Sequence, residues 1–312
     1  MDKVNVYTST GIKLLHHPKA VFDFMRGLAT PISLQVAPTS RCNLKCSFCS
    51  NVNRSSHEDL GIEDLLRVIH RLKIYGLKTI EITGGGDPTL YQYINELIEE
   101  CYRAMLKIGF ITNGVALLDN VLESSLRMLS WLRVSMNCLD YVPSVDLPKI
   151  EGTLGFSYVV NDRTKMDTLL KVKQYAEKHK AKYVRIVPNC QTSFEEQDKN
   201  NRELPQLAKN MGEPFFYQAK EFKRPRECWW GYFKPFILHD SYVYPCSSVV
   251  LNDNADRRFH DRYRWCKMED LPSLYSQSIK PLSSENCEHC VFFTQNELLT
   301  DLNSPNNHKD FI

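Results

Sequence analysis

Three cysteines lie within eight consecutive residues, Cys42, Cys46 and Cys49, in the stretch RCNLKCSFC. Thiolates are ligands for zinc and for iron–sulfur clusters, and a closed site of either kind takes four ligands. Three thiolates can instead hold three irons of a four-iron cluster and leave the fourth iron open to an outside ligand. The loop therefore indicates either a cluster with one open iron or a zinc site that borrows a distant fourth ligand.

A second group of cysteines follows in the last third of the chain and ends in the stretch CEHC. Four thiolates complete a closed iron–sulfur cluster or a structural zinc site, with His289 as an alternative ligand. The remaining cysteines include Cys101, which falls in a helical stretch where we expect a small core residue. The four cysteines of this group are Cys228, Cys246, Cys287 and Cys290.

The charge balance excludes a strong global field. The 39 basic and 37 acidic residues give a formal net charge of +2, which favours neither nucleic acid nor an anionic membrane as a partner. The first twenty residues carry charges and histidines where a signal peptide needs an apolar run, and no segment approaches eighteen consecutive apolar residues. We therefore expect a soluble cytoplasmic protein, in which disulfides are not expected.

Short apolar strands alternate with amphipathic helices along most of the chain. Six such βα units form either an open doubly wound sheet or a partial barrel. The polar segment 191–225 reads as a bridge that is helical only in parts. The predicted strands cover 32–37, 78–83, 107–112, 131–136, 153–160 and 182–187, and the predicted helices cover 61–76, 91–105, 115–129 and 165–180.

Residues suited to chemistry follow each of these strands. In both candidate folds the carboxyl ends of parallel strands meet at one edge, where functional residues collect. We therefore expect a single functional rim. It combines the three-cysteine loop, the stretch GGGDP at 84–88, Asn113 with Gly114, Asn137 with Cys138, Asn161, and Asn189 with Cys190.

The sequence resembles the radical S-adenosylmethionine (SAM) superfamily over residues 31–189. The likeness rests on the CxxxCxxC loop after the first strand, the glycine-rich stretch 84–88, the TNG of 112–114 and the RVSMN of 133–137. It implies a partial (β/α)6 TIM-like barrel in which the three-cysteine loop holds a 4Fe-4S cluster. It also implies that bound SAM is cleaved by one electron to a 5′-deoxyadenosyl radical, which abstracts a hydrogen atom from the substrate.

The same resemblance implies the cofactor contacts. The glycines let the backbone approach the methionine amino group, and the strand 185–188 supports the adenine. Asp87 stands where the family more often has glutamate, and Asn137 stands where it has aspartate, so the former has a shorter reach and the latter lacks the charge. The implied SAM contacts are Phe48, Gly84, Gly85, Gly86, Asp87, Asn113, Ser135, Asn137 and Val187.

The C-terminal cysteines resemble a twitch or SPASM type of extension. The spacing is closest to the twitch of a radical dehydrogenase that acts on an aminocyclitol, and a short hairpin at 236–244 delivers the second cysteine of the set. This likeness implies an auxiliary 4Fe-4S cluster, with a structural zinc as the alternative. We expect an N-terminal extension at 1–30, the barrel at 31–215 and the auxiliary-cluster domain at 216–312.

A closed auxiliary cluster favours net oxidation, because it can accept the electron of a substrate radical. We therefore predict an oxidoreductase that acts on a small polar metabolite and receives electrons from a low-potential donor such as flavodoxin or ferredoxin. Two alternatives stay open: a maturase that cross-links or epimerises a ribosomally made peptide, and a non-catalytic metal-binding interaction protein. The candidate catalytic residues are Arg185 and, as a hydrogen donor, Cys266.

Overall fold

The computed structural model of the protein describes residues 7–8, 10–51, 57–189, 191–218, 223–247, 263–285, 287 and 290–304. Cys190 and His289, which the sequence singled out, lie outside these residues. No helix within the described ranges is long and apolar enough to cross a membrane.

One ten-stranded sheet runs through the described residues in the order β10-β9-β8-β1-β2-β3-β4-β5-β6-β7. Strands β1 to β7 are parallel, β8 pairs in parallel with β1, and β9 and β10 are antiparallel to their neighbours. The strands are β1 (Ser33–Val36), β2 (Thr79–Ile82), β3 (Lys107–Thr112), β4 (Trp131–Ser135), β5 (Thr153–Val160), β6 (Val184–Pro188), β7 (Phe215–Tyr217), β8 (Phe236–Ile237), β9 (Tyr242–Tyr244) and β10 (Cys266–Lys267).

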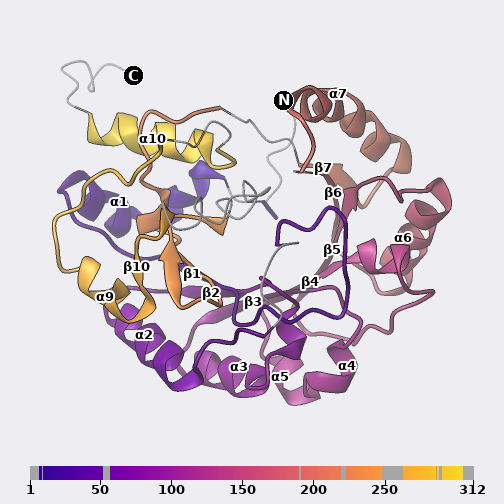
Figure 1. Cartoon of the computed structure of the whole chain (residues 1–312), viewed down its shortest axis with the longest axis horizontal. Coiled ribbons are helices and arrows are strands. Elements are labelled where there is room, and N and C mark those ends of the chain that lie inside the picture. Colours follow the sequence, from indigo (N-terminus) through magenta and orange to yellow (C-terminus); the bar gives the residue numbers. More distant parts are fainter. Residues whose placement is uncertain are drawn as a thin grey trace.

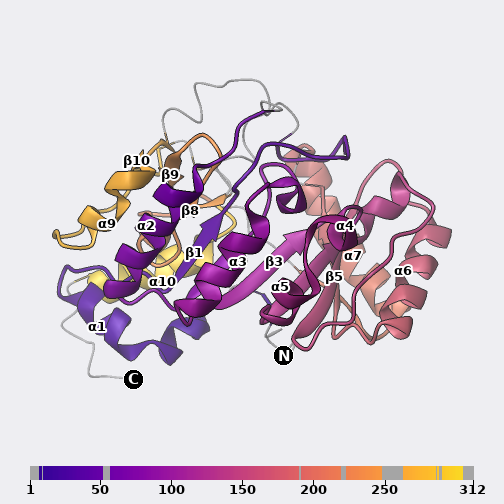
Figure 2. The same ribbon diagram turned by 90° about the horizontal axis from the view of Figure 1, so that it is seen from below.

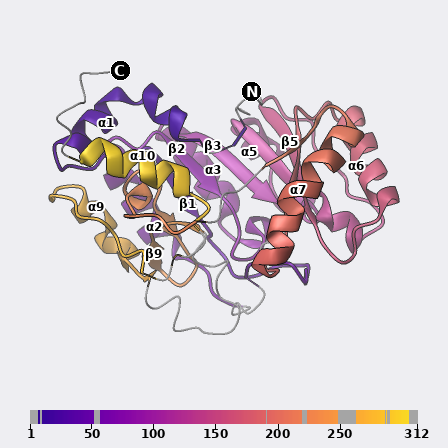
Figure 3. The same ribbon diagram turned by 90° about the horizontal axis from the view of Figure 1, so that it is seen from above.

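The sheet is curved, and helices α2 to α7 follow its outer side (Figures 1 and 2). Helices α1 and α10 lie side by side, far apart in sequence (Figure 3). The helices are α1 (Pro18–Met25), α2 (Ile62–Ile74), α3 (Ile94–Arg103), α4 (Leu117–Asn120), α5 (Glu123–Arg127), α6 (Met166–Lys178), α7 (Phe194–Met211), α9 (Leu271–Leu274) and α10 (Phe293–Asn303), with 3-10 turns η1 (Gly11–His16), η2 (Pro88–Leu90), η3 (Met136–Asp140), η4 (Trp230–Tyr232) and η6 (Met268–Asp270).

The two faces of the central strands differ in character. On β2, Ile80 and Ile82 are buried and belong to the same apolar core as Leu65 of α2. Glu81 points to the opposite face, since successive side chains of a strand alternate. The inner face of a parallel sheet is usually apolar, so its polar residues here indicate an enclosed functional space.

The helix predicted over 115–129 is wrong in its continuity, because two short helices, α4 and α5, replace it. The Asn95 side chain of α3 explains the break. Its Nδ2 donates to the Asn120 carbonyl at 2.9 Å, and its Oδ1 accepts from the Leu122 backbone N–H at 2.9 Å. These bonds engage the backbone between the two helices, and Val121 takes an extended conformation.

The segment predicted as a partly helical bridge contributes more structure than expected. Helix α7 spans eighteen of its residues and is capped by the Ser193 hydroxyl, which accepts from the Glu196 N–H at 3.3 Å. Strand β7 then joins the parallel sheet beside β6. The predicted C-terminal hairpin is confirmed as β8 and β9.

Candidate functional site

The loop after β1 brings its three cysteines together. Burial, followed by the neighbouring Cys49, raises the pKa of the Cys46 thiol to about 11, and Cys42 contributes in the same direction. The Cys49 N–H donates to the Cys46 carbonyl at 3.1 Å, and all three side chains are partly exposed. The three thiols therefore share one partly exposed loop, and their role as ligands of a cluster stays a prediction.

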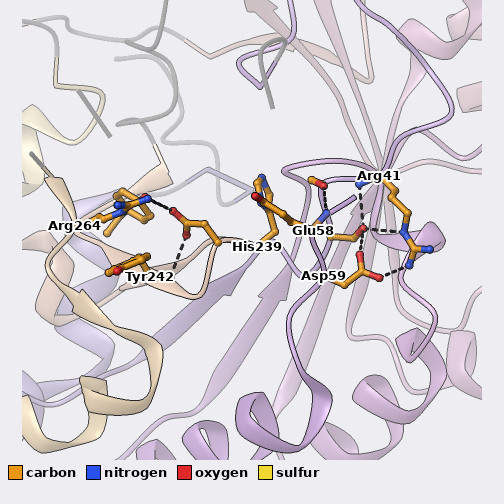
Figure 4. Close-up of polar contacts among 10 residues, drawn as sticks. Arg41, Glu58, Asp59, His239, Tyr242 and Arg264 are labelled. Atoms are coloured by element: carbon orange, nitrogen blue, oxygen red, sulfur yellow. Dashed lines mark hydrogen bonds and ion pairs between the residues drawn. The ribbon is translucent and has the colours of Figure 1, made fainter. Parts of the chain in front are cut away.

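Polar contacts join the two ends of the cysteine loop (Figure 4). The Ser40 N–H donates to the Glu58 carbonyl at 2.8 Å, and the Glu58 N–H donates to the Ser40 hydroxyl at 2.8 Å. Arg41 forms an ion pair with Asp59, whose carboxylate also accepts from the Thr39 hydroxyl. These bonds hold the backbone before Cys42 against the segment that precedes α2.

The glycine-rich stretch lies directly beneath this loop and has no room for side chains. A Cβ atom on Gly86 would lie 1.9 Å from the Arg41 carbonyl oxygen, and one on Gly84 would lie 1.7 Å from the Gly86 carbonyl oxygen. A Cβ on Gly85 would lie 2.3 Å from Cδ2 of His239. The glycines therefore allow a close approach of backbone segments, as a cradle for a ligand's polar end requires.

Asp87 anchors the glycine-rich stretch to the third strand. Its buried carboxylate accepts from the Thr89 N–H at 3.0 Å, from the Thr112 hydroxyl at 2.9 Å and from the Asn113 N–H at 2.7 Å. These donors engage both oxygens, so the structure gives the side chain a positioning role within the protein. Its contact with the cofactor's amino group stays a prediction.

Asn113 links the third strand to the cysteine loop. Its Nδ2 donates to the Asn43 side chain at 2.7 Å and lies 3.9 Å from the Cys42 sulfur. Its Oδ1 accepts from the Val115 N–H at 2.9 Å. If Cys42 binds a cluster, an amide N–H beside its sulfur is the kind of contact that tunes a metal site, and the contact of Asn113 with SAM stays a prediction.

The ends of the fourth and fifth strands meet at Asp140, which sequence reasoning missed. Its carboxylate accepts from the Asn137 amide at 3.0 Å, the Tyr158 hydroxyl at 2.7 Å and the Asn161 amide at 3.3 Å. Asn137 is buried and also pairs with the Val159 backbone through both amide atoms. A carboxylate just after a strand end was the available signal for Asp140.

The other predicted cofactor contacts lie at the same rim. Ser135 ends β4 and Phe48 lies in the cysteine loop, both partly exposed, while Val187 is buried on β6. Tyr141, which sequence reasoning missed, accepts a hydrogen bond from the Ser47 N–H at 3.4 Å. The SAM contacts of these side chains stay predictions.

The four C-terminal cysteines lie near enough to one another for the charges of three of them to act on the fourth. Burial, followed by the charges of Cys246, Cys290 and Cys287 in that order, raises the pKa of the Cys228 thiol well above its usual value. Cys246 and Cys287 border a small apolar cluster, separate from the main core. Within the described part of the chain, no three His, Cys, Asp or Glu side chains are grouped as a site for a single metal ion.

Asn296 of α10 supports this second group and was missed by sequence reasoning. Its Nδ2 lies 3.5 Å from the Cys290 sulfur, and its Oδ1 accepts from the N–H groups of Trp229 at 2.8 Å and Trp230 at 2.9 Å. The buried side chain therefore ties Cys290 to the backbone that follows Cys228. A lone asparagine in a helix gave no signal for this contact.

The two predicted catalytic residues lie apart. Arg185 of β6 donates from Nη1 to the Gln218 side chain at 2.7 Å. It also lines a cavity on the inner face of the curved sheet. Cys266 lies on β10, where burial, followed by the charge of Asp270, raises its thiol pKa to about 12, and it is not among the described residues that line that cavity. The donor role of Cys266 gains no support from this position. Cys101 is confirmed as a core residue.

His239 connects the C-terminal hairpin to the rim (Figure 4). It is buried in the turn between β8 and β9, its ring packs against Gly85, and its Nδ1 lies 2.9 Å from a carboxylate oxygen of Glu58. The hairpin therefore contacts both the glycine-rich stretch and the segment that closes the cysteine loop.

Replacing His239 with alanine is expected to lower the free energy of unfolding by about 2–3 kcal/mol, because it removes the hydrogen bond to Glu58 and opens a void beside Gly85. Urea denaturation of the two proteins measures this difference. The exposed His70 of α2 provides the control, since His70→Ala is expected to change stability by less than about 0.5 kcal/mol. Equal stabilities for the two variants would show that the hairpin contact contributes nothing.

The comparisons with known proteins cover the part of the chain that forms most of this rim. The protein-family model described as Radical SAM superfamily matches residues 36–141. GTP 3′,8-cyclase of Clostridium perfringens is 30% identical over 127 residues, which are 39% of each chain. An S-adenosylmethionine-dependent nucleotide dehydratase, RSAD2 of Oncorhynchus mykiss, is 25% identical over 182 residues, which are 56% of this chain and 49% of that one. The matches therefore span half or less of these relatives.

A solved structure supports the fold. SuiB of Streptococcus suis, bound to its precursor peptide SuiA, has a TM-score of 0.55 at 15% identity, over 94% of this chain and 79% of that chain. This likeness concerns the fold alone and confirms the predicted α/β partial barrel. The match to the Radical SAM superfamily model covers the cysteine loop, the glycine-rich stretch and the third and fourth strands, so this part of the chain is similar to a radical SAM domain.

Proposed function

We propose that this protein is a radical SAM oxidoreductase that oxidises a small polar metabolite with the help of an auxiliary 4Fe-4S cluster. The observation that supports the proposal is that Cys246, Cys287 and Cys290 lie near enough to Cys228 for their charges to raise the pKa of its thiol, apart from the three-cysteine loop. Four thiolates leave no open ligand position on a four-iron cluster, which suits electron transfer better than substrate binding.

The residues of the rim fit the cofactors that a radical SAM domain uses. Cys42, Cys46 and Cys49 would hold the cluster with the open iron, and the glycine cradle would receive the polar end of SAM. When bound, SAM and the cluster would together supply a 5′-deoxyadenosyl radical that takes one hydrogen atom from the substrate. The protein's own part is to position the substrate beneath the rim and to exclude water.

The position of the cavity supports a part for the second cysteine group in the proposed oxidation. Ser247 and Val291, which follow Cys246 and Cys290 in sequence, line the cavity inside the sheet. A substrate in that cavity would therefore lie beside the auxiliary site, which would supply an acceptor for the second electron while a proton leaves to solvent. A low-potential donor such as flavodoxin or ferredoxin would supply the initiating electron.

Two relatives support a small polar substrate, since their names describe reactions of GTP and of nucleotides. A peptide is the second candidate, because the structure of SuiB that shares the fold holds the precursor peptide SuiA. In that case the same radical and the same acceptor would serve an oxidative cross-link. Mass spectrometry of products formed from nucleotides and from peptides distinguishes the two.

Replacing Cys228 and Cys290 together with alanine tests the auxiliary cluster. After anaerobic reconstitution, the iron content is expected to fall from about eight to about four per chain, because only the cluster of the three-cysteine loop remains. Formation of 5′-deoxyadenosine should persist while the yield of oxidised product falls. Iron and sulfide counting, with zinc measured in the same samples, provides the readout.

The buried Cys101 of α3 provides the matched control, since its replacement by alanine removes a thiol that lies in the apolar core. That variant should retain about eight irons. If the native chain instead contains about four irons and one zinc, the second group is a structural zinc site and the proposed electron acceptor is wrong.

A further inference from the structure

A cavity of about 560 Å³ lies on the inner face of the curved sheet. Strand positions that alternate with the apolar core line its wall, including Gln35, Glu81, Arg133 and Arg185. The volume is within the range of sites for small molecules, roughly 300–1,000 Å³. Under the proposed function, on which this inference rests, the cavity is the place for the substrate.

The segment before α1 closes the cavity at the amino ends of the strands. Tyr7 stacks on Tyr183 with ring centroids 4.5 Å apart, and Lys13 and Leu14 also line the space. At the other side, Trp230 and Phe292 stack at 5.4 Å beside the second cysteine group. The cavity is therefore bounded by two separate parts of the chain in addition to the strands.

Positive charge dominates this enclosed space. Among the described residues that line it, Glu81 is the acidic one, and it faces four basic side chains. The Lys234 ammonium lies 3.2 Å from the Glu81 carboxylate and so compensates its charge. Lys13, Arg133 and Arg185 also line the cavity, so basic side chains outnumber acidic ones among its described lining residues, which favours an anionic occupant.

The electrostatics of two of these residues agree with that excess. Burial, followed by the charge of Lys234, lowers the pKa of Lys13 from its usual value. Burial alone would raise the pKa of Glu81, but the positive charges of Lys234 and then Arg133 outweigh it and lower the pKa overall. Glu81 is thus held ionised. Its single negative charge offsets only part of the repulsion among the basic side chains that surround it.

Buried hydrogen-bond donors without an acceptor among the described residues line the cavity and include Nε of Arg133 and Nε1 of Trp230. The Trp230 side chain belongs to a residue that is only 8% exposed, and the Arg133 guanidinium lies 5.4 Å from the centre of the Trp131 ring. Buried donors without partners are rare and cost free energy, so they indicate an acceptor supplied by a ligand.

We propose that this cavity binds the oxyanion group of a small substrate, a carboxylate or a phosphate, through Arg133 and Trp230. A guanidinium presents planar, charge-assisted donors that match two oxygens of either group. The indole N–H adds a neutral donor from the side of the second cysteine group. The substrate class is therefore an anionic small metabolite, held with its oxyanion inside the sheet.

The test measures binding to the reconstituted full-length protein, held anaerobically without reductant, by isothermal titration calorimetry. Inorganic pyrophosphate probes a phosphate site, and glutarate probes a carboxylate site. At least one of them is expected to bind, and Arg133→Gln should weaken that binding by about 10- to 100-fold because a charged hydrogen bond is lost. Trp230→Phe removes only the indole donor and should weaken it by about 3- to 10-fold.

Arg67→Gln provides the matched control, since Arg67 lies exposed on α2 and should leave binding unchanged. Far-UV circular dichroism melts show whether each variant is folded, and Arg133→Lys, which retains the charge, should bind with intermediate affinity. The proposal is overturned if neither probe binds, if Arg133→Gln and Trp230→Phe bind as the native chain does, or if SAM displaces the probe. The iron content of the auxiliary site is measured in a separate experiment. If that experiment shows no auxiliary cluster, the binding measurement still tests the anion site.

Discussion

Replacing Cys42, Cys46 and Cys49 with alanine is expected to abolish 5′-deoxyadenosine formation and to remove about four of about eight irons. The three thiols lie together in one loop, and the charges of Cys49 and Cys42 add to the burial that raises the pKa of Cys46. No other group of thiols at this rim can substitute for them, because Cys138, the remaining described cysteine there, is buried. Anaerobic reconstitution with iron counting and nucleoside analysis gives both readouts.

Cys138→Ala is the control for this experiment. Cys138 lies in η3 and is buried in the core; burial is the largest cause that raises the pKa of its thiol to about 12, and the charge of the nearby Cys46 acts in the same direction. The variant should retain all of its iron and its SAM cleavage. Iron loss in Cys138→Ala equal to that of the triple variant would contradict the assignment of ligands to the loop.

Gly86→Ala is expected to lower SAM affinity by at least about 100-fold and stability by about 1–3 kcal/mol. The added Cβ would lie 1.9 Å from the Arg41 carbonyl oxygen and 2.6 Å from the Ser40 carbonyl carbon. Both neighbours are backbone atoms, so the start of the cysteine loop must move away from the glycine cradle. Titration calorimetry with SAM and urea denaturation measure the two effects.

Gly61→Ala provides the comparison, because a Cβ at Gly61 would lie 3.5 Å from an Asp64 carboxylate oxygen, which is an ordinary contact. Its backbone is in a common extended conformation at the start of α2, so little strain is added. SAM should bind this variant as it binds the native chain. Native affinity in Gly86→Ala would show that the cradle does not carry the cofactor.

Regular elements and their order were predictable because each has a local signal. Alternating or apolar runs identified β1 to β6 and the hairpin of β8 and β9, and amphipathic spacing identified α2, α3 and α6. The break after α4 was not predictable, since it depends on Asn95 of a different helix. Strands β7 and β10 are too short to give a period.

At the candidate site, the spacing of the cysteines and glycines carried the prediction, whereas the residues that contact them gave no signal in the sequence. Asp140, Tyr141 and Asn296 have hydrogen-bond partners that are distant in sequence, and nothing in their own neighbours indicates which group each will contact. Asp87 shows the converse case. Its position was predicted correctly at the rim, yet its four donors come from Thr89, Thr112 and Asn113, which only the fold brings together.

The pairing of β8 with β1 joins the first strand of the barrel to the C-terminal third of the chain. Backbone N–H groups of Ser33, Gln35 and Ala37 donate to carbonyls of residues 233, 235 and 237 at 2.9–3.0 Å. Without the C-terminal third, β1 would become an exposed edge strand, and unpaired edges promote aggregation. Insertions or deletions that disturb the pairing of β8 with β1 are therefore expected to lower solubility as well as to displace the second cysteine group.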